Sequence, residues 1–166
     1  METQEAIIKR YSCRNLSPKP ISKDLIEKMI DAARLAPTAR NIQPWEFVVV
    51  TDKETLKKLG SIAETGPFIA DCSCCIVVLC KDTKYYLEDG CAATENILLS
   101  ATDLGLGSCW VAGDKKPYGE QIKQLLNVPK DFKLVSLIAL GYPEDKKAKL
   151  NVNKRSLDEV IHWEKF

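Results

Sequence analysis

Histidine is nearly absent from this 166-residue chain, which has only His162. Any metal site would therefore need cysteine thiolates or carboxylates as its ligands. Neither sign of charge is in excess, because 24 basic residues face 23 acidic ones and leave a net charge of +1. Such a balance creates no general attraction for nucleic acid or for an anionic membrane surface. Any anion site on this protein must be a local cluster of cations.

Long apolar runs are missing as well. The first 30 residues contain nothing like the apolar core of a secretory signal, and no stretch approaches the roughly 20 apolar residues of a membrane span. There is no G-x-x-x-x-G-K-[ST] loop, and GLGSCW at 105–110 lacks the third glycine and the preceding strand of a dinucleotide fingerprint. We therefore expect a soluble cytoplasmic protein that does not bind nucleotides by these two routes.

Cysteine, in contrast, is plentiful. Seven cysteines, an odd number without a signal peptide, favour free thiols in a reducing compartment over a disulfide framework. Four of them lie in DCSCCIVVLC, which could suggest a metal or iron–sulfur site. However, successive side chains of a strand point to opposite faces and cannot all converge on one ion. We predict no metal site and expect buried packing residues on a strand at Cys72, Cys74, Cys75 and Cys80.

The composition, 45% hydrophobic and 28% charged, is typical of one globular domain, here 1–166. Apolar residues at helical spacing predict helices over 23–36, 53–63, 84–105 and 120–126. Ser22 and Asp52 are the expected N-caps of the first two. Apolar and β-branched runs predict strands at 45–51, 74–80, 108–112 and 133–141. The second strand is apolar throughout, which indicates a sheet covered on both faces.

The C-terminal segment from Tyr142 to Phe166 has a different character. It is polar and charged at first and becomes apolar only near its end, at Leu157, Val160, Ile161 and Trp163. A tail with so few apolar residues cannot pack alone and needs another surface to lie against.

Two basic clusters at opposite ends of the chain are candidates for an anion site. The sequence IIKRYSCRNLS at 7–17 brings together three cations and two hydroxyls, Lys9, Arg10, Arg14, Tyr11 and Ser12. The tail adds Lys154 and Arg155. Arginine makes a planar two-pronged contact with a phosphate and lysine acts as a point charge, so the two clusters could bracket one phosphate. Taken alone, each cluster is more often a set of solvated surface charges.

Four segments of the chain, in order, resemble flavin-dependent nitroreductases. KRYSCR is similar to the Arg-x-Ser-x-Arg segment that opens those proteins, and APTARNIQPWEFVVV to their Ala-Pro-Ser-x-x-Asn-x-Gln-Pro-Trp and following strand. AATENILLSATDLGLGSCWVAG resembles their long central helix and the next strand. GYP followed by KRSLDEVIHWE resembles their C-terminal pattern. The resemblance covers essentially the whole chain and is specific for the family, but not for a substrate.

The resemblance implies an α+β fold, an α/β sandwich with a central, mainly antiparallel sheet of four or five strands flanked by helices. It implies a homodimer with FMN at the subunit interface and an extended C-terminal tail that wraps the partner. The expected activity is that of an FMN-dependent oxidoreductase, a nitroreductase or quinone reductase that takes electrons from NADH or NADPH. A ping-pong cycle would pass them to a small oxidised acceptor.

The resemblance also implies which residues hold the flavin. The opening segment would bind its phosphate and ribityl chain through Arg10, Tyr11, Ser12 and Arg14, with Lys154 and Arg155 also reaching the phosphate. The contribution to the partner's flavin would come from Pro37, Thr38, Ala39 and Asn41. Backbone groups along the ring system would come from Trp110, Val111, Ala112 and Gly113. This last segment departs from the Pro-x-Glu-Gly of larger nitroreductases, so we expect no glutamate against the ring.

The expected chemistry belongs to the flavin, with protein groups setting its position and electronics. We expect no side-chain nucleophile or general base, and Arg14 is the candidate cation that would stabilise the reduced flavin. Two alternatives stay open: a flavin-modifying or dehalogenating relative, and a flavin-binding redox sensor that uses a reactive thiol such as Cys13. Asp89, inside the long predicted helix, is either a surface charge or an interface partner.

Overall fold

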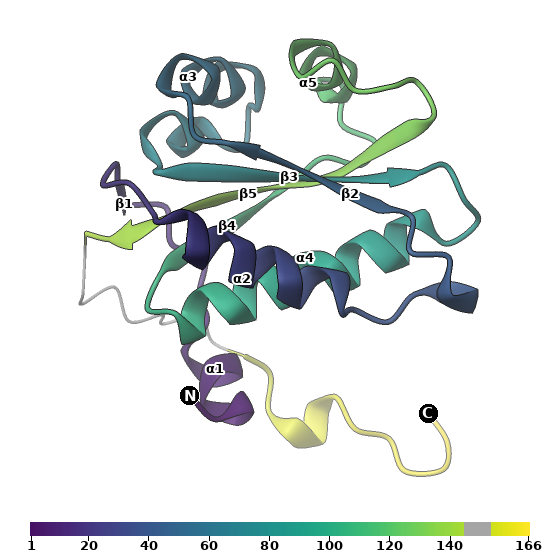
Figure 1. Ribbon diagram of the computed structural model, residues 1–166. Helices are drawn as coiled ribbons and strands as arrows, with labels where there is room; N and C mark the ends of the chain where they lie inside the picture. The colour runs from purple at the N-terminus through teal and green to yellow at the C-terminus, as the bar shows by residue number, and fades with distance from the viewer. Residues whose placement is uncertain (145–153) are drawn as a thin grey trace.

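The computed structural model describes residues 1–144 and 154–166 (Figure 1). Its elements follow one another in the order α1 (Thr3–Lys9), β1 (Leu16–Ser17), α2 (Lys23–Arg34), η1 (Ala39–Asn41), β2 (Trp45–Val50), α3 (Lys53–Ile62), η2 (Pro67–Asp71), β3 (Cys74–Lys81), α4 (Tyr86–Asp103), β4 (Gly107–Ala112), α5 (Gly119–Leu125), β5 (Phe132–Pro143) and η3 (Leu157–Glu159). Residues 145–153 of the expected extended tail lie outside the described residues.

The five strands form one sheet in which β5 is the central element. β5 pairs antiparallel with β1, β3 and β4, and β2 pairs antiparallel with β3. A parallel bridge joins Ser12 to Ser108 on β4. The expected α+β fold with a mainly antiparallel sheet of four or five strands is therefore confirmed, the fifth strand being the two-residue β1.

Helices cover both faces of the sheet, as the apolar run of β3 predicted. Figure 1 shows α2 and α4 on one face and α3 and α5 on the other. Alternate residues of β3 enter the two cores: Ile76 and Val78 pack with the α2 and α4 side, and Val77 and Leu79 with the α3 and α5 side. Burial of apolar area in two layers is the main stabilising term of such a sandwich.

The predicted elements agree with the structure to within a few residues, with three differences. The first long helix ends at Arg34, although Pro37 had suggested an end nearer to it. Ser22 occupies the N-cap position but makes no side-chain capping bond, whereas Asp52 accepts one from the Thr55 N–H. Helix α1 and the short elements β1, η1, η2 and η3 were not predicted, because each has too few residues to show a period.

The cysteines behave as packing residues, although Cys72 lies just before β3 rather than on it. Cys74 and Cys80 enter one core, while Cys72 and Cys75 enter the other. Burial raises the pKa of the Cys72 thiol to about 11 and those of Cys74 and Cys80 to about 12. Within the described residues, no group of three or more His, Cys, Asp or Glu side chains is placed to hold a metal ion.

Replacing Cys75 with serine should lower the free energy of unfolding by about 1 to 3 kcal/mol, because a hydroxyl would enter a fully buried apolar site. Urea unfolding followed by circular dichroism measures this change. The matched control is Cys91→Ser on α4, where the side chain is only partly buried. Stoichiometric iron or zinc in freshly purified protein would contradict the packing role.

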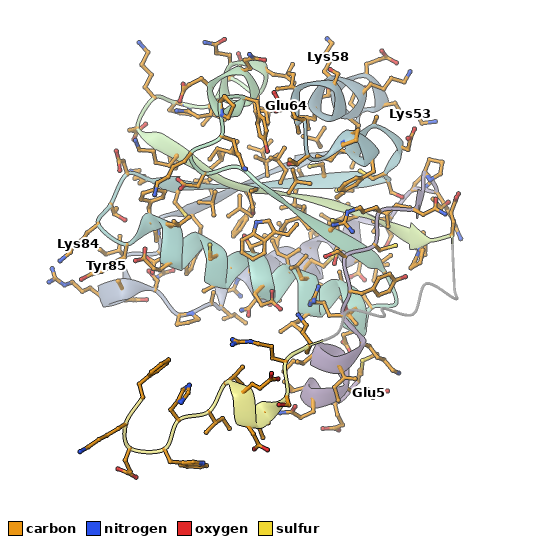
Figure 2. The ribbon with its side chains drawn as sticks, turned by 180° about the vertical axis from the view of Figure 1, so that it is seen from behind. Glu5, Lys53, Lys58, Glu64, Lys84 and Tyr85 are labelled. Carbon is orange, nitrogen blue, oxygen red and sulfur yellow. The ribbon has the colours of Figure 1, made fainter. Side chains whose placement is uncertain are left out.

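The described part of the tail lies on the surface. In Figures 1 and 2 the segment that begins at residue 154 lies beside α1. Four of its apolar side chains are exposed, those of Leu157, Val160, Trp163 and Phe166. In the isolated chain, therefore, the apolar end of the tail has little cover. None of the helices in 1–144 and 154–166 combines the length and apolar character needed to cross a membrane.

Candidate functional site

The basic segment 10–14 follows α1 and runs beside β4. Ser12 forms a bridge with Ser108, and the Cys13 N–H donates to the Ser108 carbonyl at 2.9 Å. Residue 108 is only two positions before Trp110. The structure thus brings the segment expected to hold the phosphate and ribityl chain next to the strand expected to lie along the flavin ring.

Both arginines of this segment keep most of their donors available within the described part of the chain. The Arg10 Nε lies 3.8 Å from the Glu95 Oε1 on α4, which is longer than a hydrogen bond. The Arg14 side chain contacts the Ser12 carbonyl at 3.5 Å, and its guanidinium lies 5.9 Å from the centre of the Phe68 ring. Each guanidinium has five N–H donors, so both can still bind an anion.

The positive charges of these arginines affect a side chain of β4. Burial, the largest effect, raises the pKa of the Cys109 thiol, and the positive charges of Arg14 and Arg10 act in the opposite direction. Cys109 directly precedes Trp110. The two cations therefore lie within electrostatic range of the strand segment that is expected to contact the flavin ring.

The outer edge of β4 presents the backbone groups of Trp110, whose carbonyl also accepts a weak 3.9 Å bond from the Cys109 Sγ. The Ser108 and Ala112 carbonyls face this edge, where they accept bonds from the Cys13 N–H at 2.9 Å and the Tyr118 hydroxyl at 2.6 Å. Backbone groups of an antiparallel strand alternate in direction, so those of Trp110, midway between, face the same way. Trp110 can therefore offer an N–H and a C=O to a planar ligand lying along the strand.

Gly113 ends this segment in a tightly packed position. Its N–H donates to the Val135 carbonyl at 3.0 Å, and a Cβ there would come within 2.6 Å of the Leu134 side chain. The next residue, Asp114, accepts a 2.5 Å bond from the Tyr86 hydroxyl on α4. This bond is the main reason why the pKa of Tyr86 is raised to about 12. The Tyr86 hydroxyl is therefore a stable neutral donor at ordinary pH.

One buried hydroxyl beside this site lacks a partner among the described residues. The Ser108 Oγ makes no hydrogen bond within 1–144 and 154–166, and Ser108 is only 2% exposed. An unsatisfied buried polar atom is uncommon and calls for an explanation, such as a water or a ligand group. Together with the available arginine donors and the outward-facing backbone of Trp110, it makes a donor set that fits a phosphate and a heteroaromatic ring.

The segment 37–43 lies apart from the arginine cluster, beside the N-terminal end of α4 (Figures 1 and 2). Thr38 and Ala39 are anchored there by Asp89, whose carboxylate accepts from the Thr38 hydroxyl at 2.9 Å and from the Ala39 N–H at 3.0 Å. Pro37 and Asn41 are exposed. The structure therefore does not bring this group together with Arg10 and Arg14 through any described contact in one chain.

The basic pair of the tail, Lys154 and Arg155, is exposed. The tail segment that begins with this pair lies beside α1, the helix that ends directly before Arg10 (Figure 2). The N-terminal helix and the C-terminal tail therefore lie on the same side of the molecule, and the basic pair of the tail is accessible to solvent.

The structure does not support the alternative of a flavin-binding redox sensor that uses Cys13 as its reactive thiol. Cys13 is 4% exposed, packs in the core with Leu16, and donates through its Sγ to the Asn15 carbonyl at 3.4 Å. A thiol that is closed off from solvent cannot react readily with a redox partner.

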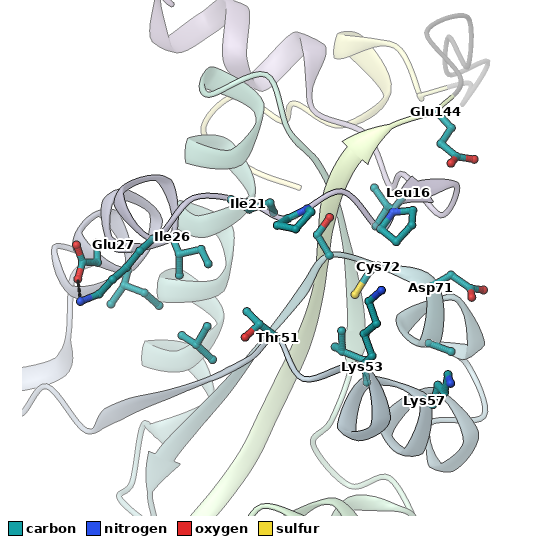
Figure 3. A pocket seen from close by; sticks show the side chains of 18 of the residues that line it. Leu16, Ile21, Ile26, Glu27, Thr51, Lys53, Lys57, Asp71, Cys72 and Glu144 are labelled. Carbon is teal, nitrogen blue, oxygen red and sulfur yellow. Dashed lines mark ion pairs between the residues drawn. The ribbon is translucent and has the colours of Figure 1, made fainter.

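A cavity of about 1210 Å³ lies elsewhere, at the β2 edge between α2 and α3 (Figure 3). Its floor is apolar, with Ile21, Ile26 and Leu56, and charged side chains such as Lys53 and Glu27 stand at its rim. None of the residues expected to bind flavin lines this cavity. This cavity is therefore not the place where the sequence motifs converge.

Sequence reasoning missed three residues of the site. Asp89 was considered but left without a role, and neither Tyr86 nor Asp114 was singled out. The only sequence signal for Asp89 was an acidic residue in a helix whose neighbours are small and apolar. Its contact with Thr38 spans 51 positions and could not be read from spacing alone.

Comparisons with known proteins identify the family of the chain. Residues 7–71 match the Nitroreductase family, and residues 60–166 match the family described as "Putative TM nitroreductase". The chain is 39% identical to the Archaeoglobus fulgidus protein named "Putative NADH dehydrogenase/NAD(P)H nitroreductase", over 99% of each chain. It is 26% identical to the FMN reductase [NAD(P)H] of Bacillus subtilis, over 89% of this chain and 68% of that one.

A solved structure extends the likeness to three dimensions. The FMN-dependent nitroreductase of Clostridium difficile R20291 superposes with a TM-score of 0.88 at 29% identity, covering 97% of this chain and 98% of that one. Sequence and backbone thus agree over nearly the full length.

Proposed function

Because the chain belongs to the nitroreductase family of oxidoreductases, we propose that it binds FMN and transfers electrons from NADH or NADPH to a small oxidised acceptor. The cofactor site would lie at the interface between two copies of the chain. The names of the FMN reductase and FMN-dependent nitroreductase relatives support FMN as the cofactor.

One observation of this structure supports the proposal most strongly. The bridge between Ser12 and Ser108 aligns the arginine segment with the outer edge of β4, where the backbone of Trp110 faces outward. A phosphate at one end and a flat ring with hydrogen-bonding edges at the other are what such a site can hold. FMN has both features.

In this proposal the chain supplies binding and electrostatics rather than acid–base groups. Bound FMN would supply the exchange of hydride and electrons. Arg10, Lys154 and Arg155 hold the phosphate by charge-assisted hydrogen bonds, while Tyr11 and Ser12 line the ribityl chain. Arg14 supplies a positive charge near the ring. Trp110, Val111, Ala112 and Gly113 lie along the ring, and Trp110 offers the hydrogen-bonding backbone groups, since the Ala112 carbonyl and the Gly113 N–H already bond Tyr118 and Val135.

The homodimer is part of the same proposal. Pro37, Thr38, Ala39 and Asn41 would complete the site of the partner, and the exposed apolar end of the tail would be covered by the partner's surface. The exposed side chains of Ile7 and Ile8 on α1 add to the apolar area near the tail. Contiguous exposed apolar area of this kind is typical of an interface.

The test of the proposed function is a pair of half-reactions. Purified protein reconstituted with FMN should lose its yellow colour anaerobically when NADH or NADPH is added, and regain it with a nitroaromatic or a quinone. An iodinated phenol as acceptor would test the dehalogenating alternative. Protein that takes up FMN but is not reduced by either nicotinamide would be a flavin-binding protein of another kind. Protein that takes up no flavin would refute the proposal.

Replacing Arg14 with glutamine should make the two-electron potential of bound FMN more negative by about 30 to 60 mV. The loss of one charged contact to the reduced form, about 1.5 to 3 kcal/mol, corresponds to this shift for two electrons. Spectroscopic titration against a reference dye measures the potential. Arg14→Lys keeps the charge and should shift the potential less. Equal potentials in the wild type and Arg14→Gln would exclude this role for Arg14.

A further inference from the structure

The loop from Thr38 to Gln43 has an unusual backbone. Arg40, Asn41 and Gln43 have positive φ angles of 54°, 55° and 52°. Asparagine tolerates this left-handed region, but arginine and glutamine enter it at a cost in free energy. Such a conformation persists only where surrounding contacts impose it, and it occurs most often at functional sites.

Asp89 supplies the contacts that impose it. One carboxylate oxygen accepts from the Thr38 hydroxyl at 2.9 Å, and the other accepts from the Ala39 N–H at 3.0 Å. The same Thr38 hydroxyl accepts from the Gln43 N–H at 3.1 Å. The beginning and the end of the loop are thus both tied, directly or through one hydroxyl, to a single side chain of α4.

Asp89 is itself held in place. It is 5% exposed and lies in the first turn of α4, where the helix dipole favours a negative charge. The next residue, Gly90, packs so closely on the sheet that a Cβ would approach the Val135 side chain to 2.7 Å. The start of α4 therefore cannot shift relative to β5, and the carboxylate is a fixed point for the loop.

Helix α4 contacts the loop through Asp89 and the arginine segment through Glu95, and these two contacts lie on different sides of the helix. Glu95, whose carboxylate lies 3.8 Å from the Arg10 Nε, follows Asp89 by six positions, which is about 9 Å along the axis and about 120° around it. The loop and the arginine segment therefore meet α4 on different faces. This arrangement suits a helix that serves two separate cofactor sites, its own and that of a partner.

We propose that Asp89 is a positioning residue for the partner's flavin: its buried carboxylate holds the loop 38–43 in the shape that completes the cofactor site of the other subunit. The inference rests on the proposed function. Asp89 would not itself touch a flavin, and its effect would be on the flavin bound by the other subunit. Loss of the carboxylate should let the loop relax and so weaken flavin binding at that other site.

The first experiment compares Asp89→Ala with Glu88→Gln, an exposed acid of the same turn. FMN affinity is measured by fluorescence quenching, and dimerisation by sedimentation. We expect Asp89→Ala to lose about tenfold or more in affinity, since the loop no longer gains its conformation from the protein. Glu88→Gln should bind like the wild type. Wild-type affinity in folded Asp89→Ala would overturn the inference and leave the proposed function intact.

A second pair covers the case in which Asp89→Ala does not fold. Thr38→Val removes the hydroxyl that joins Asp89 to the Gln43 N–H, whereas Thr38→Ser keeps it. Affinity should fall in the valine variant and recover in the serine variant. Equal affinities in the two variants would show that the hydrogen bond to Asp89 does not shape the loop.

Mixed dimers test the action in trans. Subunits of Asp89→Ala and Arg10→Ala, carrying different affinity tags, are combined and the mixed dimer is isolated. It should hold one site with both the intact arginine segment and the intact loop, so one FMN per dimer binds with wild-type affinity. If Asp89 acts within its own chain, both sites of the mixed dimer are defective. Failure of the mixed dimer to recover a site would therefore refute the assignment to the opposite subunit.

Discussion

Changing Arg10 and Arg155 together to alanine should weaken FMN binding by about 100-fold to 10,000-fold while leaving riboflavin binding nearly unchanged. Each charged hydrogen bond to the phosphate contributes about 1.5 to 3 kcal/mol, and riboflavin has no phosphate to lose. Within the described residues the Arg10 guanidinium makes a long contact with Glu95, at 3.8 Å, and is available for a ligand. Fluorescence titration of the apoprotein with both flavins measures the difference.

The matched control is Lys9→Ala with Lys165→Ala. These two lysines lie in the same parts of the chain and their removal changes the net charge equally. Neither is among the residues that the family resemblance assigns to the phosphate, and Lys9 is paired with Glu5 in the structure. If the control weakens FMN binding as much as the test variant, the effect is one of overall charge. Equal losses for FMN and riboflavin in the test variant would show that the two arginines do not bind the phosphate.

Deleting residues 154–166 should convert most of the protein to monomer and remove most of its FMN. The tail ends in the exposed side chains of Leu157, Val160, Trp163 and Phe166, and in the isolated chain they are not packed against a core. If the partner covers them, their loss removes apolar contact area from the interface. Because cofactor binding and association are linked when a site is shared, both should fall together.

Sedimentation and flavin absorbance on the same samples measure the two quantities. A variant with only Trp163 and Phe166 changed to serine keeps the basic pair and should impair association first, with added FMN partly restoring the dimer. A truncated protein that sediments as a monomer and still holds stoichiometric FMN would rule out the shared site and the role of Lys154 and Arg155.

Most of the sandwich could be predicted from the sequence because its signals are local. The apolar run of β3, the helical spacing in α2 and the Asp52 cap each depend on neighbouring residues. The order in which the strands pair in the sheet could not be predicted from such local signals. β5 joins strands that are far apart in the sequence, and nothing in its composition says which of them will lie beside it.

The candidate site was predictable only as separate pieces. The motif around Arg10 and Arg14 was recognisable, but its alignment with β4 depends on a bridge across 96 positions, from Ser12 to Ser108. The role of Asp89 depends on the left-handed turn that begins at Arg40. Neither arginine nor glutamine favours that conformation, so residue preferences alone pointed away from it. Long-range contacts decided both features.

The central position of β5 affects how the chain can be made in the cell. Synthesis proceeds from the N-terminus, and β5 is the last strand to emerge, although β1, β3 and β4 all pair with it. Until then β3, which is buried along nearly its whole length in the finished protein, has only β2 as a partner. The nascent chain must therefore carry an unpaired apolar edge while residues 82–143 are made, over a third of the chain. This is the condition that promotes aggregation and recruits chaperones. Conditions that slow translation after α4 should prolong this exposure, whereas slowing before β3 should not.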